Sequence, residues 1–293
     1  MHRRDFILAA LAALTGPMAA GRAETTGSSR RFRQRLADIE RRVAGRLGVA
    51  VLDVGTGRRL GYREHERFPM CSTFKWLLVA QVLSRVDRGE ERLERRVPYG
   101  PSDLLEYAPV TREHVSEGAM SVSALCDAAI RYSDNTAANL LLPTVGGPAG
   151  LTAYLRGIGD PATRLDRMEP ELNSAVPGDP RDTTTPAAML ANLRRVLLGR
   201  ELSDASRERL LGWLVGNTTG AAKLRAGLPG HWRVGDKTGM GEHGATNDVA
   251  IVWPARGAPL LVAAYLTESM VPVDARNEAL ADVGRLVTDR VAG

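Results

Sequence analysis

Residues 70–89 read MCSTFKWLLVAQVLSRVDRG. Residues 74–86 are strongly apolar and are followed by Asp87-Arg88-Gly89, which predicts a long buried helix with a defined end. Ser72 and Lys75 lie three residues apart where this helix would begin, so their side chains would share one face. The N–H groups at a helix N-terminus favour negative charge. By themselves, however, the two residues are better explained as a helix cap and a surface lysine.

The rest of the chain predicts helices around this segment and strands near both ends. The predicted helices cover residues 30–46, 121–132, 136–142, 186–198, 206–215 and 273–291, and the predicted strands cover 48–53, 59–62, 233–238, 247–253 and 260–267. We therefore expect an α+β fold with two lobes. An antiparallel five-stranded sheet flanked by the terminal helices would come from about 28–63 and 216–293. An all-helical lobe would come from about 64–215, with the active site in the cleft between the lobes.

Composition excludes several classes of protein. The chain has 293 residues, of which 44% are hydrophobic and 25% charged, and this argues against disorder. The net charge of +5 comes from basic residues spread along the chain, so we expect no nucleic-acid partner. Two cysteines and five histidines are too few for a disulfide scaffold and make a zinc site improbable. We expect no metal and no cofactor.

The N-terminus predicts export. Arg3 and Arg4 precede a short apolar run, and small residues lead to a cleavage site after Ala23. The paired arginines favour a twin-arginine signal over 1–23, with an ordinary secretory signal as the alternative. No later segment has 18 uninterrupted apolar residues, so no membrane anchor is expected. The remaining 24–293 would be a single catalytic domain, periplasmic or secreted.

Two further motifs are weak when taken alone. Ser133-Asp134-Asn135 falls between two predicted helices, where it could equally be a turn and a helix cap. Lys237-Thr238-Gly239 ends a predicted strand, and its glycine would let a ligand lie close to the strand edge. Ser-x-x-Lys, Ser-Asp-Asn and Lys-Thr-Gly in this order are the signature of class A β-lactamases and penicillin-binding proteins. From roughly residue 30 to 290, the sequence resembles a class A serine β-lactamase.

A fourth motif separates these two families. Glu169-Pro170-Glu171-Leu172-Asn173 lies in a long stretch without clear periodicity, and such loops are usually functional. The resemblance implies that Glu169 and Asn173 activate the water that hydrolyses an acyl-enzyme. It also implies an Arg167–Asp182 salt bridge that closes the loop. The motif therefore favours hydrolysis of the β-lactam amide over the alternatives, a cell-wall D-Ala-D-Ala peptidase or a non-hydrolytic β-lactam sensor.

The resemblance also implies individual roles. Ser72 would be the nucleophile, the N–H groups of Ser72 and Met240 would bind the oxyanion, and either Lys75 or Glu169 through a water would take the serine proton. The remaining implied residues are Ser133 as proton relay, Lys237 beside it, Thr238 for the substrate carboxylate, Gly239 for the substrate along the strand edge, Asn135 for the side-chain amide, and Asn139 supporting Glu169. Tyr107 would line the entrance, with simple packing as the alternative. The partners would be a β-lactam and a water, and we expect a monomer.

Some positions depart from familiar members of that family. A carboxylate-binding arginine is replaced by Thr246, and Lys223 is the best substitute by position, with Arg225 and Arg276 as alternatives. Lysine would supply a point charge without the guanidinium fork. In some members of the family, the cysteines at the positions of Cys71 and Cys126 form disulfides with other cysteines. The partner position is Gly241 for Cys71 and Val79 for Cys126 in this sequence, so both usual partners are missing. We expect two free buried thiols, although a direct bridge between the two cysteines remains an alternative.

Overall fold

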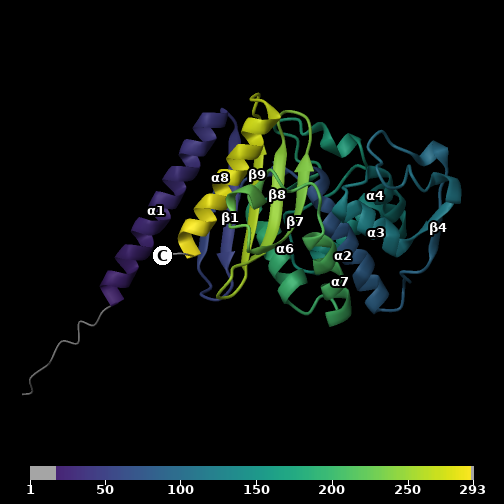
Figure 1. Cartoon of the computed structure of the whole chain (residues 1–293), viewed down its shortest axis with the longest axis horizontal. Helices are drawn as coiled ribbons and strands as arrows, with labels where there is room; N and C mark the ends of the chain where they lie inside the picture. The colour runs from purple at the N-terminus through teal and green to yellow at the C-terminus, as the bar shows by residue number, and fades with distance from the viewer. Residues whose placement is uncertain (1–17, 292–293) are drawn as a thin grey trace, which may run out of the picture.

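The computed structural model describes residues 18–291 and consists of a sheet with helices on both faces (Figure 1). The five-stranded sheet has the order β2-β1-β9-β8-β7 and is antiparallel throughout. Its strands are β1 (Arg46–Asp53), β2 (Arg59–Tyr62), β7 (Arg233–Met240), β8 (Thr246–Trp253) and β9 (Leu260–Thr267). The α+β prediction and the antiparallel five-stranded sheet are confirmed.

The two ends of the chain meet in this sheet. β1 pairs with β9 over its whole length, from Arg46 opposite Thr267 to Asp53 opposite Leu260. Helices α1 (Met18–Val43) and α8 (Val273–Val291) cover one face, as Figure 1 shows. Their apolar stripes, with Leu36 and Leu280 fully buried, pack against the sheet side chains that alternate toward that face.

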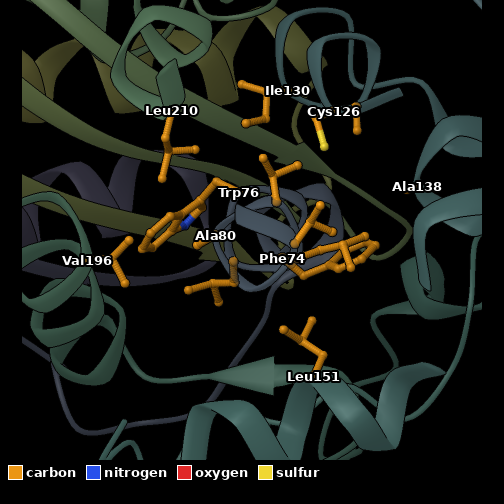
Figure 2. Close-up of a cluster of buried hydrophobic side chains, with 14 of the residues drawn as sticks. Phe74, Trp76, Ala80, Cys126, Ile130, Ala138, Leu151, Val196 and Leu210 are labelled. Carbon is orange, nitrogen blue, oxygen red and sulfur yellow. The ribbon is translucent and has the colours of Figure 1, made fainter. Parts of the chain in front are cut away.

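The opposite face of the sheet carries the helical part of the chain. At its centre lies α2 (Phe74–Asp87), whose residues 74–84 are all buried. Trp76 and Ala80 project from one side of it and Phe74 from the other, into side chains of the surrounding helices (Figure 2). The neighbouring helices are α3 (Val122–Arg131), α4 (Asn135–Leu141), α5 (Gly147–Gly157), α6 (Pro186–Leu198) and α7 (Asp204–Val215). A helix that is apolar on all sides needs such a complete enclosure.

Two predicted element ends differ in the structure. The apolar spacing of the predicted helix 30–46 continues to Leu47, whereas α1 ends at Val43 and Leu47 belongs to β1. Ala44 takes a φ of 44°, and the Glu40 carboxylate accepts the Leu47 N–H at 2.9 Å, which turns the chain into the strand. Leu47 packs into the same cluster as the helix, so its periodic position gave a misleading signal.

The nucleophile segment also differs in detail. Ser72 lies in a short 3-10 turn, η1 (Cys71–Thr73), and α2 begins only at Phe74. Helix α5 and two two-stranded pairs are not evident from the sequence: β3 (Phe68–Pro69) with β6 (Thr183–Thr184), and β4 (Arg96–Pro98) with β5 (Ala119–Ser121). Strands of two or three residues are too short to show an alternating pattern. The remaining 3-10 turns are η2 (Pro101–Asp103), η3 (Val115–Glu117), η4 (Leu142–Val145), η5 (Glu171–Ser174) and η6 (Leu224–Gly227).

The predicted export signal falls largely outside the structure. Residues 1–17 of the predicted signal 1–23 lie outside the described residues. Within the described part, none of the helices combines the length and the apolar character needed to cross a membrane.

The contact between η6 and α8 provides a test of the packing behind the sheet. A Cβ on Gly227 would lie 1.8 Å from the carbonyl oxygen of Ala281 and 2.7 Å from the Arg285 nitrogen. We expect Gly227→Ala to lower the free energy of unfolding by about 3 kcal/mol, because overpacking forces backbone to move. Gly230→Ala is the matched control, since a Cβ there meets nothing within 4 Å. Urea unfolding of both variants measures the difference, and equal stabilities would contradict this packing.

Candidate functional site

A cleft of about 350 Å³ lies where β7 faces the helical part. Its lining residues are Ser72, Tyr107, Ser133, Asn135, Asn173, Thr219, Lys223, Thr238, Gly239 and Met240. The structure thus gathers residues from three of the sequence motifs around one cavity, together with Asn173 from the fourth. Lys75 and Glu169 lie beneath its surface with fully buried side chains.

Close packing of β7 on η1 positions Ser72 at the base of this cleft. The carbonyl of Met70 accepts hydrogen bonds from the Thr73 hydroxyl at 2.8 Å and from the Asn247 amide at 3.0 Å. A Cβ on Gly239 would lie 2.7 Å from that same carbonyl oxygen. Glycine at position 239 is therefore required for the strand to approach the turn that carries Ser72.

Glu169 connects Ser72 with Lys75. The Ser72 hydroxyl donates to Glu169 Oε1 at 3.2 Å, and Lys75 Nζ lies 2.9 Å from the same oxygen. The sequence predicts that the side chains of Ser72 and Lys75 share one face, and both heads do reach the same Glu169 oxygen. Among the hydrogen bonds of the described residues, however, none joins the two heads directly. A carboxylate oxygen between the two heads takes the place of the direct contact.

Lys75 has three hydrogen-bond acceptors. Besides Glu169, it donates to the Ser133 carbonyl at 2.8 Å and to Asn135 Oδ1 at 2.6 Å. Burial lowers the pKa of Lys75, and the Glu169 charge opposes that shift. When Lys75 is an ammonium, these acceptors engage all three of its hydrogens, and its nitrogen then has no lone pair with which to accept a proton.

The long irregular loop holds Glu169 from several sides. Asn173 Nδ2 donates to Glu169 Oε2, while the Asn139 amide donates to the Glu169 carbonyl at 2.8 Å. The Glu169 N–H donates in turn to Asn139 Oδ1 at 3.0 Å, and the Glu169–Pro170 bond is cis. The Asn139 and Asn173 side chains therefore fix both the backbone and the carboxylate of Glu169.

An ion pair closes the base of the same loop. Arg167 Nε donates to Asp182 Oδ2 at 2.6 Å, as the resemblance implies. Asp182 Oδ1 also accepts the N–H groups of Asp166 at 2.7 Å and Arg167 at 2.9 Å. The side chain of Asp182 is 1% exposed, so these donors compensate for its lost hydration.

Ser133 and Lys237 approach one another across the cleft. Ser133 adopts a φ of 59° at the turn before α4, where Asp134 caps the helix by accepting the Ala137 N–H at 2.9 Å. Lys237 Nζ donates to Ser133 Oγ at 3.0 Å and to the Thr238 carbonyl at 2.9 Å. Burial, assisted by the nearby Lys75 charge, lowers the pKa of Lys237 to about 7.

The hydroxyl of Thr238 belongs to a chain of hydrogen bonds that the sequence does not reveal. Asn217 Nδ2 donates to Asp236 Oδ2 at 2.7 Å, and its Oδ1 accepts the Thr219 hydroxyl at 2.8 Å. The single hydrogen of Thr219 is thus engaged, so the hydrogen shared between Thr219 and Thr238 comes from Thr238. Thr238 must give up that bond before it can donate to a ligand. The one hint in the sequence was Asp236, a charge within a strand.

The structure distinguishes among the three basic residues that could replace the missing arginine. Arg225 donates to Asp236 at 2.6 Å, and Arg276 is not among the cleft-lining residues. Lys223 lines the cleft although its side chain is largely buried. Burial lowers the pKa of Lys223, while Asp248 and Asp236 oppose that shift.

Tyr107 and Met240 are at the rim. Their side chains are 52% and 44% exposed, and both line the cleft. Cys71 and Cys126 are free and buried. In the part of the chain that the structure describes, no cluster of histidine, cysteine or acidic residues could hold a metal ion.

Comparisons with known proteins agree with one another. The family model described as the β-lactamase enzyme family matches residues 31–291. β-Lactamase L2 of Stenotrophomonas maltophilia is 55% identical, over 88% of this chain and 84% of the relative. β-Lactamase CTX-M-25 of Escherichia coli is 50% identical, over 87% and 88% of the two chains.

Solved structures give the same result. The class A β-lactamase of the last common ancestor of Gram-negative bacteria is 65% identical with a TM-score of 0.87, over 89% of this chain and 99% of that one. A putative class A β-lactamase, PenP from Rhodopseudomonas palustris, is 55% identical with a TM-score of 0.87, over 88% and 99%.

The buried ion pair of the loop can be tested by Asp182→Asn. We expect the free energy of unfolding to fall by about 3 kcal/mol, since this change leaves Arg167 without its buried charge partner. Glu278→Gln removes an exposed ion pair with Arg285 and should change the free energy of unfolding by less than about 1 kcal/mol. Denaturant unfolding measures both variants. A loss for Asp182→Asn no larger than that control would show that the pair does not hold the loop.

Proposed function

This chain belongs to the class A β-lactamases, enzymes that hydrolyse β-lactam antibiotics and confer resistance to them, and we propose that it acts through an acyl-enzyme on Ser72. The arrangement of Glu169 carries the proposal. One carboxylate oxygen meets the Ser72 hydroxyl and the Lys75 ammonium, and the other accepts a hydrogen bond from Asn173. A buried base so placed can serve both the nucleophile and a water.

Acylation begins with attack by Ser72 Oγ on the lactam carbonyl carbon. Glu169 takes the hydroxyl proton, because its Oε1 already accepts that bond and the three hydrogens of Lys75 are engaged. The N–H groups of Ser72 and Met240 bind the developing oxyanion. As the C–N bond breaks, Ser133 gives its proton to the lactam nitrogen, and Lys237 stabilises the resulting negative charge on Ser133 Oγ from 3.0 Å. The proton that Glu169 took from Ser72 then passes by way of Lys75 to Ser133 Oγ, which restores both the serine hydroxyl and the Glu169 carboxylate before deacylation.

Deacylation requires a water next to the ester. Asn173 Oδ1 is buried and has no hydrogen-bond partner among the described residues, so it can accept one from the attacking water. Glu169 removes the second hydrogen as the water oxygen attacks the ester carbon, and Ser72 Oγ leaves with a proton. Asn139 holds the backbone of Glu169 during this step.

Substrate binding uses the cations of the cleft. Lys237 and Lys223 supply positive charge for the carboxylate of the β-lactam, and Thr238 donates to it after release from Thr219. The Gly239 edge of β7 and Asn135 bind the substrate backbone and its side-chain amide, and Tyr107 borders the entrance. Lys223 takes the place of the missing arginine, because Arg225 is occupied by Asp236.

A cell-wall D-Ala-D-Ala peptidase and a non-hydrolytic sensor share the same nucleophile. The Glu169–Asn173 pair favours the hydrolase over both, because an acyl-enzyme without an activated water persists. We further propose that residues 1–23 form an export signal of the twin-arginine type, that the mature catalytic domain is 24–293, and that it acts as a periplasmic or secreted monomer.

Turnover of a chromogenic cephalosporin tests the role of Glu169. We expect steady hydrolysis by the native enzyme. Glu169→Gln should give one product per active site and then stall, with deacylation slowed about 1,000-fold. Acylation persists in this variant because Lys75, freed from its carboxylate partner, can take the Ser72 proton. Glu171→Gln, an exposed acid in the same turn, is the control and should behave as wild type.

Two outcomes would contradict the proposal. A single burst by the native enzyme, without steady turnover, would favour the sensor. Native-like turnover by Glu169→Gln would refute the role of Glu169.

The lowered pKa of Lys237 predicts a pH dependence. In the free enzyme the lysine loses its proton as pH rises through about 7, so kcat/KM for an anionic β-lactam should fall above that pH. Lys237→Arg keeps its charge throughout this range and should show a flat profile with a reduced maximum. The same alkaline fall in the arginine variant would assign the ionisation to another group.

A further inference from the structure

The turn between β7 and β8 lies directly on the loop that carries Glu169. The Glu242 N–H donates to the Asn173 carbonyl at 2.9 Å. His243 Nδ1 lies 2.9 Å from the next carbonyl, that of Ser174. Because a carbonyl oxygen only accepts, the ring nitrogen is the donor in this contact. Two consecutive carbonyls of the loop are therefore bound by two consecutive residues of the turn.

Close packing shows how firmly these two segments meet. A Cβ on Gly241 would lie 2.6 Å from the Asn173 carbonyl oxygen and 2.7 Å from Cys71 Sγ. The turn thus touches both the loop and the segment that carries the nucleophile. His243 has a φ of 49°, a left-handed conformation that few residues other than glycine adopt, although asparagine, aspartate and histidine are enriched there. This conformation occurs at the point where the histidine ring reaches the loop.

The bound segment contains the residue that orients the catalytic carboxylate. Asn173 donates to Glu169 Oε2, whereas Oε1 is held separately by Ser72 and Lys75. A displacement of Asn173 therefore disturbs the Oε2 side of Glu169 and leaves its contacts with the nucleophile in place. Deacylation needs Glu169 and Asn173 together, while acylation depends on Oε1.

We propose that His243 is a positioning residue for deacylation: its ring holds the Asn173–Ser174 backbone against the β7–β8 turn and so keeps the Asn173 amide on Glu169. This inference rests on the proposed function, in which Glu169 and Asn173 activate the water. His243 touches neither substrate nor reacting atoms and acts only through the loop.

Two substitutions isolate the contribution of the ring. His243→Gly removes the ring and accepts the φ of 49° without strain, so folding is preserved. His243→Asn keeps a side-chain N–H donor and also tolerates that conformation. His231 is an exposed histidine before β7, and His231→Ala is the matched control. Thermal unfolding of each variant verifies an intact fold.

Burst and steady-state kinetics with a chromogenic cephalosporin separate the two chemical steps. The loss of one hydrogen bond should slow deacylation about fivefold in His243→Gly. When deacylation limits turnover, kcat and KM should both fall about fivefold while kcat/KM stays within about twofold of wild type. His243→Asn should recover most of kcat, and His231→Ala should be unchanged.

The outcomes distinguish this inference from the proposed function. A wild-type kcat in His243→Gly overturns the inference, and so does a fall in kcat/KM as large as the fall in kcat, which would indicate a general structural role. If Glu169→Gln stalls but His243→Gly does not slow, only the inference fails. If Glu169→Gln turns over normally, the proposed function fails first. Adding His243→Gly to Glu169→Gln should cause no further slowing of deacylation.

Discussion

The buried ion pair between Lys75 and Glu169 is the constraint on which the rest of this structure depends. Both side chains have no exposed area, and their charged atoms are 2.9 Å apart. Two ions withdrawn from water are tolerated only when further hydrogen bonds replace their hydration. Lys75 obtains them from the Ser133 carbonyl and Asn135, and Glu169 from Ser72 and Asn173. Satisfying this one pair therefore brings three motifs, distant in sequence, to one place.

The scaffold around the pair is built to keep it there. α2 is enclosed on all sides, so Lys75 cannot move toward solvent without disrupting the core. On the other side, glycines allow the edge strand β7 and its turn to press against η1 and the loop. The loop has little regular structure, and side chains such as Asp182 and Asn139 supply most of its order. In this loop, side-chain hydrogen bonds thus provide the order that backbone hydrogen bonds between strands provide in the sheet.

Electrostatics in the cleft follow from the same burial. Lys237 and Lys75 are both withdrawn from water, and each makes the other's charge less favourable, which brings the pKa of Lys237 to about 7. An anionic substrate would reverse that balance by supplying the missing counter-charge. The hydrogen-bond chain from Thr238 to Asp236 adds a further demand, because Thr238 must leave Thr219 before it can donate to a ligand.

The sequence by itself determined the fold class, the family and the order of the longer helices and strands apart from α5. Apolar periodicity indicates the buried faces of helices and strands. The three motifs, together with Glu169 and Asn173, identify the reactive side chains by residue type and spacing alone. Short-range signals could not show that Leu47 is a strand residue or that Glu169 stands between Ser72 and Lys75. They also missed the network of Thr219, Asn217 and Asp236 and the contact of His243 with Ser174. These features join residues far apart in the chain, and only tertiary packing decides which distant polar atoms meet when water is excluded.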